Sequence, residues 1–302
     1  MQLHRHHFAA MGGPCELQVG LPDPGQAARV LAAAEQEVRR IEWKYSRYRA
    51  ESLVSQINAQ AGKDWTACDD ETLHLLEVAD QLHQNSQGLF DATSGVLRRA
   101  WRFDGSQAAP SQAELDPLLA LVGWSGVERR GHEVRLRSPG MELDFGGFGK
   151  EYAVDRVAAQ LQAEGVPHGL VNLSGDLRVW GGRPDGTPWQ LGIQHPRRPG
   201  AVLASLPLRQ GALASSGDYE RCFIDAQGQR HCHILHPKTG RPAYDWQSVS
   251  VVAPLALMAG GLSTVAMLMG PEAPDWLRRQ SVDFLAVDAQ GQLHSSNDAG
   301  AD

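Results

Sequence analysis

The sequence predicts an α+β fold, because helical and strand patterns occur in one chain without the regular alternation of a doubly wound sheet. Residues 26–45 place apolar side chains at helical spacing and charged side chains on the other faces, which indicates an amphipathic helix. The later part of the chain instead contains short apolar runs punctuated by glycine, proline and aspartate, which are typical of strands. We therefore expect helices that cover sheets.

Further elements follow in order along the chain. Asp69 and Asp70 suit a helix N-terminus, and the apolar spacing after them predicts a helix that ends before Gly88. Residues 141–145 alternate apolar and acidic side chains, and helical spacing begins at Lys150, so a strand, a glycine turn and a helix should follow one another. Short strands are expected around residues 170–173, 189–194, 222–224 and 248–252, then a helix over 257–269 and a hairpin over 282–295.

Two segments show neither pattern. Residues 102–117 are predicted to form an exposed loop, and residues 4–7, with the sequence HRHH, a solvated end. The chain has no internal repeat at a fixed period and no low-complexity linker. One continuous domain over residues 1–302 is therefore the simplest organisation.

Composition limits the classes of function. The chain has 302 residues, of which 42% are hydrophobic, enough for a substantial core. Its net charge is −7 and no long run of one charge sign occurs, so neither nucleic acid nor membrane insertion is expected. The start lacks the apolar core of a signal peptide, which predicts a cytoplasmic protein, with an exported full-length form as the alternative. Four cysteines without a Cys-x-x-Cys pair should be mostly buried thiols.

The segment ELDFGGFGKEYAVD suggests an anion site. It has three glycines within four residues, followed by Lys150 at a helix start, where free backbone N–H groups and the helix dipole favour a pyrophosphate. The spacing fits neither the Walker loop nor the G-x-G-x-x-G fingerprint. A plain strand-to-helix turn is the alternative.

The segment YSRYRAESLVSQIN is polar and aromatic directly after the first helix. Ser46 and Tyr48 could hydrogen-bond to and stack on a planar ligand. The alternative is a helix-to-loop junction in which Ser52 caps a short helix.

In GLFDATSG, a carboxylate follows two apolar residues. Asp91 and Thr93 come just after Leu89 and Phe90, an arrangement in which a flavin ring or a ribose could bind. An Asx or Ser/Thr turn is equally compatible with this pattern.

SSGDYERCF and HCHILHPKTG contain the reactive-looking groups. Ser215 and Ser216 lack the G-x-S-x-G context of a hydrolase nucleophile, which argues against serine hydrolysis. His231 and His233 would share one face of a strand, and with His236 they could form a zinc site. A role for His233 as a base or polariser fits better, because imidazole titrates near neutral pH.

These segments occur in the order seen in the FAD:protein FMN transferase (ApbE-like) family, which the chain resembles from about residue 8 to residue 290. The resemblance rests on MGG at residues 11–13 and then on YSRYRAES, GLFDATSG, LDFGGFGKEYAVD, LVNLSGD, ASSGDYER, HILHPKTGRP, SVSVVAP and LSTVAMLMG. It implies a single domain of mixed, largely antiparallel sheets covered by helices. It also implies an enzyme that binds FAD and Mg²⁺ and transfers FMN to a Thr or Ser hydroxyl of a partner flavoprotein, with release of AMP.

The resemblance also assigns site residues. His233 would assist proton removal, with Ile234 beside it at the FAD site. Contacts to FAD would come from Met11, Ser46, Tyr48, Leu89, Phe90, Asp91, Asp144 and Lys150. The metal would be held by the Gly147 carbonyl and the hydroxyls of Ser263 and Thr264.

Three positions depart from the family pattern. Gly13 replaces a threonine, His236 replaces an aspartate, and Gly260 stands where an aspartate usually supplies the metal with a carboxylate. The resemblance therefore implies a weakened metal site, unless another acid such as Asp218 or the FAD phosphates compensate. The alternatives are an FAD-binding protein without transferase activity, a metal-dependent FAD pyrophosphatase, and a non-enzymatic scaffold.

Overall fold

The computed structural model describes residues 1–103 and 109–298. It is built on an eight-stranded sheet in the order β1-β2-β6-β7-β10-β13-β14-β15, in which every pair of neighbours is antiparallel. The strands are β1 (Gln2–Ala10), β2 (Gly13–Leu21), β6 (His168–Leu173), β7 (Asp176–Trp180), β10 (Gly211–Gly217), β13 (Trp246–Ala253), β14 (Asp283–Asp288) and β15 (Leu293–Ser295).

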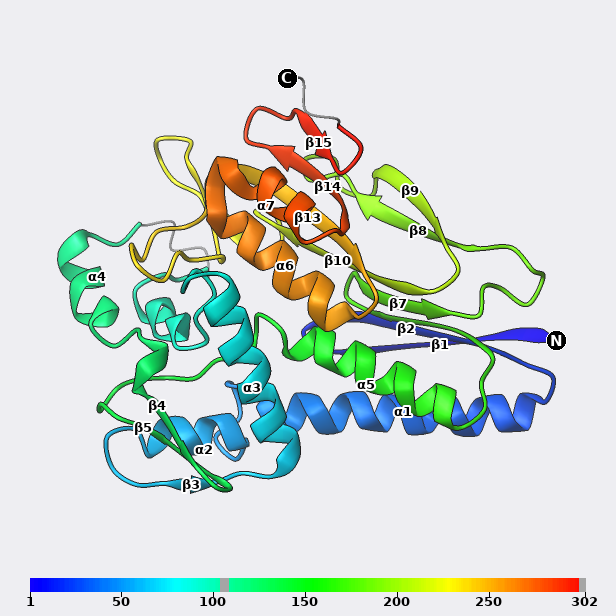
Figure 1. The fold of residues 1–302 in the computed structure, drawn as a ribbon, viewed down its shortest axis with the longest axis horizontal. Coiled ribbons are helices and arrows are strands. Elements are labelled where there is room, and N and C mark those ends of the chain that lie inside the picture. Colours follow the sequence, from blue (N-terminus) through cyan, green and yellow to red (C-terminus); the bar gives the residue numbers. More distant parts are fainter. Residues whose placement is uncertain (104–108, 299–302) are drawn as a thin grey trace.

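Three helices cover one face of this sheet. Helix α1 (Pro24–Tyr45) contacts β1 and β2, α5 (Gly149–Ala163) contacts β6 and β7, and α6 (Ala256–Met269) contacts β10 and β13. Figure 1 shows them side by side, α1 in blue, α5 in green and α6 in orange, and α5 contacts both of its neighbours. The large core lies between these helices and the sheet.

The opposite face is covered by a separate hairpin. Strands β8 (Trp189–Gln194) and β9 (Val202–Leu208) pair with each other. A second apolar cluster joins Trp189 and Leu191 of this hairpin to side chains of β6, β7 and β10. The sheet is therefore buried on both faces over its central strands.

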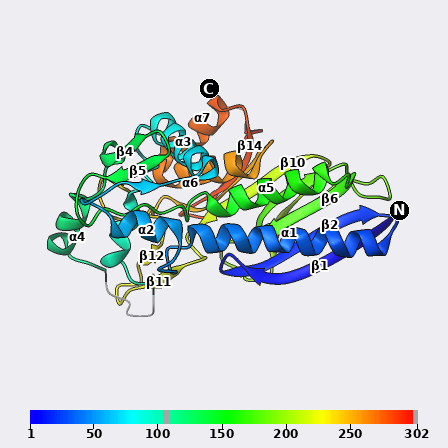
Figure 2. The ribbon, with the colours of Figure 1, turned by 90° about the horizontal axis from the view of Figure 1, so that it is seen from below.

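The remaining elements form a lobe at one end of the sheet. Both views place this lobe away from the N-terminus (Figures 1 and 2). It contains α2 (Leu53–Ala59), α3 (Asp70–Asn85), η1 (Ser94–Arg99), α4 (Gln112–Leu119), η2 (Trp124–Gly126), the sheet of β3 (Thr66–Ala67), β5 (Glu133–Leu136) and β4 (Val127–Arg130), and the hairpin of β11 (Cys222–Ile224) and β12 (Arg230–Cys232). The chain continues from α6 through η3 (Gly270–Glu272) and α7 (Ala273–Arg279) into β14.

Most of the elements predicted from the sequence are confirmed. The helices over 26–45, after Asp69 and over 257–269, the short strands and the closing hairpin all occur. Asp69 caps α3 by accepting a hydrogen bond from the Thr72 N–H, and Ser52 caps α2 in the same way through the Ser55 N–H. Among the described residues, no helix combines the length and the apolar character needed to span a bilayer.

The cysteines also behave as predicted, since Cys15, Cys68 and Cys232 are buried free thiols and Cys222 is half-buried. Burial raises the pKa of the Cys68 and Cys232 thiols to about 11.

The strand predicted over residues 141–145 is wrong. The segment is extended and buries alternate side chains, but its backbone bonds to a side chain of helix α2 and to a loop carbonyl instead of a neighbouring strand. The Asn58 side chain donates to the Leu143 carbonyl at 3.0 Å and accepts from the Leu143 N–H at 2.7 Å. The Asp144 N–H donates to the Ala92 carbonyl at 2.9 Å. The alternation of apolar and acidic residues therefore predicted correctly which side chains are buried. It could not predict which groups hydrogen-bond to the backbone of this segment.

Two predictions of irregular structure are also wrong. Residues 4–7 lie within β1, which pairs with β2 along its full length, and His6 bonds to Glu35 of α1. Part of the loop predicted over 102–117 is helix α4, whose start is fixed by a hydrogen bond from the Ser111 N–H to Glu114 Oε2 at 2.8 Å. Residues 104–108 of that prediction lie outside the described residues.

Candidate functional site

The segment from Asp144 to Glu151 connects two groups of polar side chains. Asp144, Arg47, Tyr48 and Arg98 are called the rim cluster. Lys150, Glu151 and Asp176, with the hydroxyls of Ser216, Ser263 and Thr264, are called the deep cluster. Both lie near the N-terminal end of α5, where the sheet meets the lobe.

The rim cluster is held together by ion pairs. Asp144 Oδ2 accepts hydrogen bonds from Arg47 Nη1 and Arg98 Nη1, each at 2.5 Å, and Asp144 Oδ1 accepts from the Gly146 N–H at 2.9 Å. The Arg47 guanidinium lies over the Tyr48 ring at 4.8 Å from its centroid. Tyr48 is 77% exposed, so its ring is free to contact a planar ligand.

An apolar wall adjoins the rim cluster. Phe90 is buried and its ring packs on Phe148 with the centroids 5.8 Å apart. A Cβ placed on Gly147 would lie 3.3 Å from the Phe90 ring, so glycine lets the backbone run close to that ring. Leu89 is half-buried beside it.

Asp91 bonds inward to its own loop. Its Oδ1 accepts from the Thr93 N–H at 2.8 Å and from the Thr93 hydroxyl at 2.5 Å, which is the Asx turn named above as an alternative. Its Oδ2 accepts from the Trp124 N–H at 3.1 Å. Asp91 therefore anchors the loop that carries Leu89 and Phe90.

Lys150 and Asp176 form the ion pair of the deep cluster. Lys150 Nζ lies 2.7 Å from Asp176 Oδ2 and donates to the Ser174 carbonyl at 3.4 Å. Burial disfavours the charged ammonium, but the negative charges of Asp176 and Glu151 more than offset it, so the pKa of Lys150 is raised above its usual value.

Glu151 is the neighbour of this pair. The side chain is buried, and Glu151 Oε2 has no hydrogen-bond partner within the part of the chain that the structure describes. Burial, together with the charge of Asp176, raises the pKa of Glu151 well above its ordinary value. The carboxyl group lies against Gly260 of α6, since a Cβ on Gly260 would be 2.5 Å from Glu151 Cγ and 2.7 Å from Glu151 Oε1.

Hydroxyl groups complete the deep cluster. Ser216 Oγ of β10 lies 2.8 Å from Ser263 Oγ and 3.2 Å from Thr264 Oγ1 of α6. Ser263 Oγ donates to the Gly260 carbonyl at 3.0 Å. The cluster thus offers hydroxyl and carboxyl oxygen atoms, the ligand type that hard cations such as Mg²⁺ prefer, beside the ammonium group of Lys150.

The turn between β1 and β2 closes over the deep cluster. Met11 adopts φ 54° and its N–H donates to Glu42 Oε1 at 2.7 Å. A Cβ on Gly13 would lie 2.3 Å from Ser174 Oγ, so only glycine lets this turn pack on the β6–β7 turn, whose Ser174 carbonyl accepts from Lys150. The Gly13 departure is explained by that close approach.

His233 follows β12 and lies between the two clusters. Its N–H donates to the Arg221 carbonyl at 3.0 Å. The His233 side chain is exposed, yet partial desolvation by the surrounding protein and the positive charges of Arg221, Arg47 and Lys150 lower the pKa of His233 to about 4. His233 is therefore neutral at pH 7, and buried Ile234 follows it.

The zinc alternative is not supported. His231 is buried and bonds to Asp225 Oδ2 at 2.8 Å and to the Tyr244 hydroxyl at 2.9 Å, while His236 Nδ1 accepts from the Lys238 N–H at 3.2 Å. Over residues 1–103 and 109–298, no group of three or more His, Cys, Asp or Glu side chains could hold a metal ion.

Two other side chains predicted from the sequence already form hydrogen bonds within the protein. Asp218 pairs with Arg197 through two bonds of 2.6 Å, so its carboxylate is already compensated. Ser46 Oγ accepts from the Tyr48 N–H at 3.3 Å at the end of α1.

Four residues of the two clusters were not predicted. Glu151 and Arg47 lay within segments that the sequence had singled out, and Asp176 ends LVNLSGD, but spacing gave them no role. Arg98 follows GLFDATSG without any signal of its own, and the fold brings it to Asp144.

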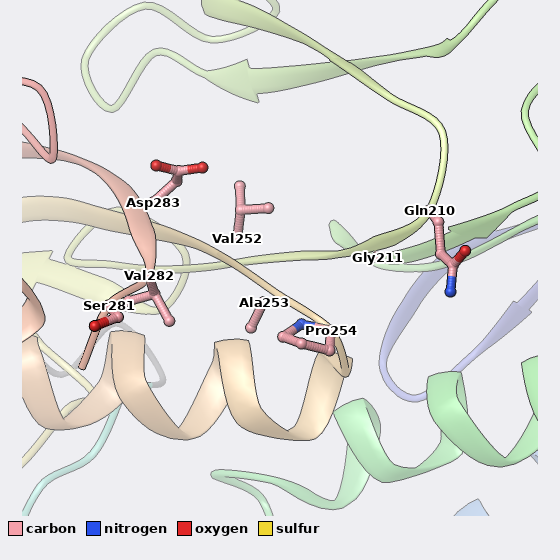
Figure 3. A pocket seen from close by; sticks show the side chains of 8 residues that line it. All are labelled: Gln210, Gly211, Val252, Ala253, Pro254, Ser281, Val282 and Asp283. Carbon is pink, nitrogen blue, oxygen red and sulfur yellow. The ribbon is translucent and has the colours of Figure 1, made fainter.

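Two hollows of the surface lie elsewhere. One, of about 430 Å³, is lined by residues 210–211, 252–254 and 281–283, where Asp283 is the one charged side chain (Figure 3). The other, of about 410 Å³, is lined by residues between 50 and 67. Neither contains a residue of the two clusters, so the candidate site is identified by its chemistry and not by concavity.

Comparisons with known proteins identify the family of the chain. The model of the ApbE family matches residues 11–286. The FAD:protein FMN transferase of Vibrio cholerae is 32% identical over 233 residues, covering 75% of this chain and 69% of the relative, and that of Salmonella typhimurium is 27% identical over 280 residues, covering 89% and 80%.

Solved structures give the same result. The ApbE protein from Thermotoga maritima superposes with a TM-score of 0.90 at 30% identity, covering 98% of this chain and 97% of that one. The flavinyl transferase ApbE of Pseudomonas stutzeri gives 0.86 at 28% identity, covering 97% and 94%. The predicted α+β fold is therefore confirmed.

Proposed function

The chain belongs to the ApbE family, and we propose that it is an FAD:protein FMN transferase, which moves FMN from FAD to a Thr or Ser hydroxyl of a partner flavoprotein with release of AMP. The observation that carries the proposal is the joining of the rim and deep clusters by one segment, residues 144–151, in a chain whose relatives carry that name. The relatives' names favour transfer over FAD binding alone and over FAD hydrolysis.

We assign FAD to the surface that runs from the rim cluster to the deep cluster. Tyr48 and Phe90 would supply aromatic contacts, and Lys150 would offset phosphate charge as a point charge. Asp144 would orient the ligand while holding Arg47 and Arg98 in place. The remaining contacts are assigned to Met11, Ser46, Leu89, Asp91 and Ile234.

The donor set also fits a divalent metal. The hydroxyls of Ser263 and Thr264 and the Gly147 carbonyl are hard oxygen ligands of the kind that Mg²⁺ binds. When bound, Mg²⁺ would neutralise charge on the phosphoryl oxygens of FAD. Asp218 is a poor candidate for the missing carboxylate, because Arg197 already pairs with it.

His233 would act as the base of the transfer. The acceptor hydroxyl oxygen attacks the FMN phosphorus, a new P–O bond forms, and the P–O bond to AMP breaks. The hydroxyl proton passes to His233, which is neutral at pH 7 because its pKa is lowered to about 4. The site draws on residues 11 to 264, so we propose that the chain works as one catalytic domain.

The test is a transfer assay on the purified chain. FAD, Mg²⁺ and a peptide bearing a Thr or Ser flavinylation motif are mixed, and covalently bound flavin and released AMP are measured. Equal amounts of both products support transfer, whereas FMN and AMP without labelled peptide identify a pyrophosphatase, and flavin binding without either product identifies a carrier.

A pair of variants tests the base. His233→Asn is expected to slow transfer by about 10²- to 10⁴-fold, the usual contribution of a general base. His74→Asn, on an exposed position of α3, should leave the rate unchanged. Equal rates for both variants would exclude His233 as the base.

A further inference from the structure

Glu151 has no function within the fold that accounts for its burial. It lies in the first turn of α5 and is 7% exposed, and within the described ranges its Oε2 atom has no hydrogen-bond partner. A buried carboxyl oxygen without a partner costs about 1–3 kcal/mol or more. Native proteins keep few such groups, and each one calls for an explanation such as a bound ion, an ordered water or a functional constraint.

The carboxyl group occupies the space that a side chain at position 260 would fill. An ideal Cβ on Gly260 would meet Glu151 Cγ at 2.5 Å, Oε1 at 2.7 Å and Cδ at 2.9 Å. These distances are shorter than nonbonded carbon and oxygen atoms tolerate. The glycine and the glutamate are therefore complementary, since α6 leaves the room and α5 fills it with a carboxyl group.

The hydroxyl groups near that carboxyl group come from one helix and the sheet. Ser263 and Thr264 lie three and four residues after Gly260, on the same face of α6. Ser216 Oγ joins their hydroxyls at 2.8 Å and 3.2 Å. The Glu151 carboxyl group thus packs against the turn of α6 that begins at Gly260 and carries the hydroxyl groups assigned to the metal.

The deep cluster has one ammonium group for two carboxyl groups. Lys150 Nζ lies 2.7 Å from Asp176 Oδ2, and the same ammonium group is the cation that neighbours Glu151. A buried carboxylate is stable when it is paired with an opposite charge or coordinates a metal. Taking up a divalent cation is one way to supply that charge.

We propose that Glu151 is the carboxylate ligand of the divalent metal, delivered from α5 in place of a carboxylate at position 260 of α6. This inference rests on the proposed function for the presence of FAD, whose phosphates share the metal. It replaces the expectation of a weakened site: the carboxylate has moved from one helix to the other.

The direct test measures metal binding and not turnover. Mn²⁺ is titrated into the full chain with FAD bound, and free Mn²⁺ is followed by its electron paramagnetic resonance signal. Glu151→Gln, which keeps the shape of the side chain, is expected to raise the Mn²⁺ dissociation constant at least about tenfold, the size that loss of a ligand or its support gives. FAD affinity without metal should change less than about twofold in the same variant.

A matched control lies on the same helix. Glu164→Gln, at the exposed C-terminal end of α5, should bind Mn²⁺ as the wild type does. An unchanged Mn²⁺ affinity for Glu151→Gln would overturn the proposal, and so would a wild-type complex with FAD that binds no Mn²⁺.

Moving the carboxylate back gives the reciprocal test. Gly260→Asp alone should gain no metal affinity, because its side chain overlaps Glu151. Glu151→Ala with Gly260→Asp removes the overlap and should bind Mn²⁺ more tightly than Glu151→Ala. Recovery supports the proposal, and equal affinity of the folded double variant and Glu151→Ala would oppose it.

The two proposals fail separately. If Mn²⁺ binding depends on Glu151 while no FMN is transferred, the ligand assignment stands and the transferase activity does not. If transfer requires Mn²⁺ while Glu151→Gln binds Mn²⁺ normally, the activity stands and the ligand assignment does not.

Discussion

The rim cluster and the deep cluster lie at the two ends of one short segment, yet they differ in how their charges are satisfied. At the rim, Asp144 has two arginine partners and a backbone N–H, and the adjoining Tyr48 ring faces solvent. In the deep cluster, one lysine faces two carboxyl groups and one of those keeps an unpartnered oxygen. The rim carboxylate therefore has its partners, although Arg47 Nε is buried without a hydrogen-bond partner among the described residues, whereas the deep cluster has one ammonium group for two carboxyl groups.

This difference suggests a role for each cluster: the rim cluster would bind FAD, and the deep cluster would hold the metal. An ion-pair network whose charges are matched can present a preformed surface to a ligand. A buried, unbalanced group is costly, and fold stability alone does not explain its presence. We therefore expect substitutions in the deep cluster to change stability and metal binding, and those at the rim to change ligand affinity.

The largest effect is expected when both carboxyl groups beside Lys150 are neutralised. Asp176→Asn alone leaves Glu151 as a partner for the ammonium group, so its cost should be moderate. Adding Glu151→Gln leaves the Lys150 ammonium group, whose side chain is 27% exposed, without either of its neighbouring carboxylates, which should lower the free energy of unfolding by up to about 3–5 kcal/mol. Urea denaturation of the single and double variants measures this, and the double variant should lose more than the sum.

The rim counterpart is Asp144→Asn. The side chains of Arg47 and Arg98 are 18% and 28% exposed, and Arg98 keeps Glu142 as a second partner at 3.8 Å, so the loss should be about 1–3 kcal/mol. Equal losses at the two clusters, or strict additivity in the deep one, would remove the distinction between them.

A smaller effect is expected from a methyl group at position 260. Gly260→Ala should lower the free energy of unfolding by about 1–3 kcal/mol, the range for overpacking, even though alanine is the better helix former. In a Glu151→Ala background the same change should be neutral or stabilising, because the overlapping atoms are gone. If Gly260→Ala still lowers the free energy of unfolding in the Glu151→Ala background, the alanine overlaps with a group other than Glu151.

The sequence predicted most of the fold, but it predicted only those parts of the site that depend on local interactions. Helix α1 and strand β8 follow periodicity alone, and the Asx turn at Asp91 and the cap at Ser52 are local interactions. Helix α4 was missed although Ser111 and Glu114 carry a capping signal, because proline and small residues around them indicated a loop.

The deep cluster could not be predicted from spacing. Glu151 and Gly260 are 109 positions apart, and their complementarity appears when α5 packs on α6. Read alone, Gly260 indicated a lost carboxylate, and Glu151 looked like an ordinary acidic residue of a first helical turn. The sequence shows which groups are present, while the packing of helices decides which groups meet.

At the rim, the expected effect is on affinity. Tyr48→Ala should leave the free energy of unfolding within about 0.5 kcal/mol, since the ring is 77% exposed. It should weaken FAD binding by about 3- to 10-fold, the size of one aromatic stacking contact. Quenching of flavin fluorescence measures the affinity, and Tyr48→Phe, which keeps the ring, should bind nearly as the wild type does.

The smallest expected effect is an absence of pH dependence, and it tests whether His233 experiences the charges of both clusters. A base works in its neutral form, and the lowered pKa of about 4 keeps His233 neutral well into the acid range. The transfer rate should therefore stay nearly constant from about pH 7.5 to about pH 5.5, where a histidine with an ordinary pKa of about 6.5 would lose about tenfold.

Arg221→Met sharpens that test, because it removes the charge that contributes most to the shift after burial. The pKa of His233 should rise, so the rate of this variant should begin to fall at a higher pH than the rate of the wild type. Circular dichroism at each pH checks that the fold persists. A wild-type rate that falls tenfold across the interval would mean that His233 carries an ordinary pKa, and that the positive charges of the two clusters do not converge on it.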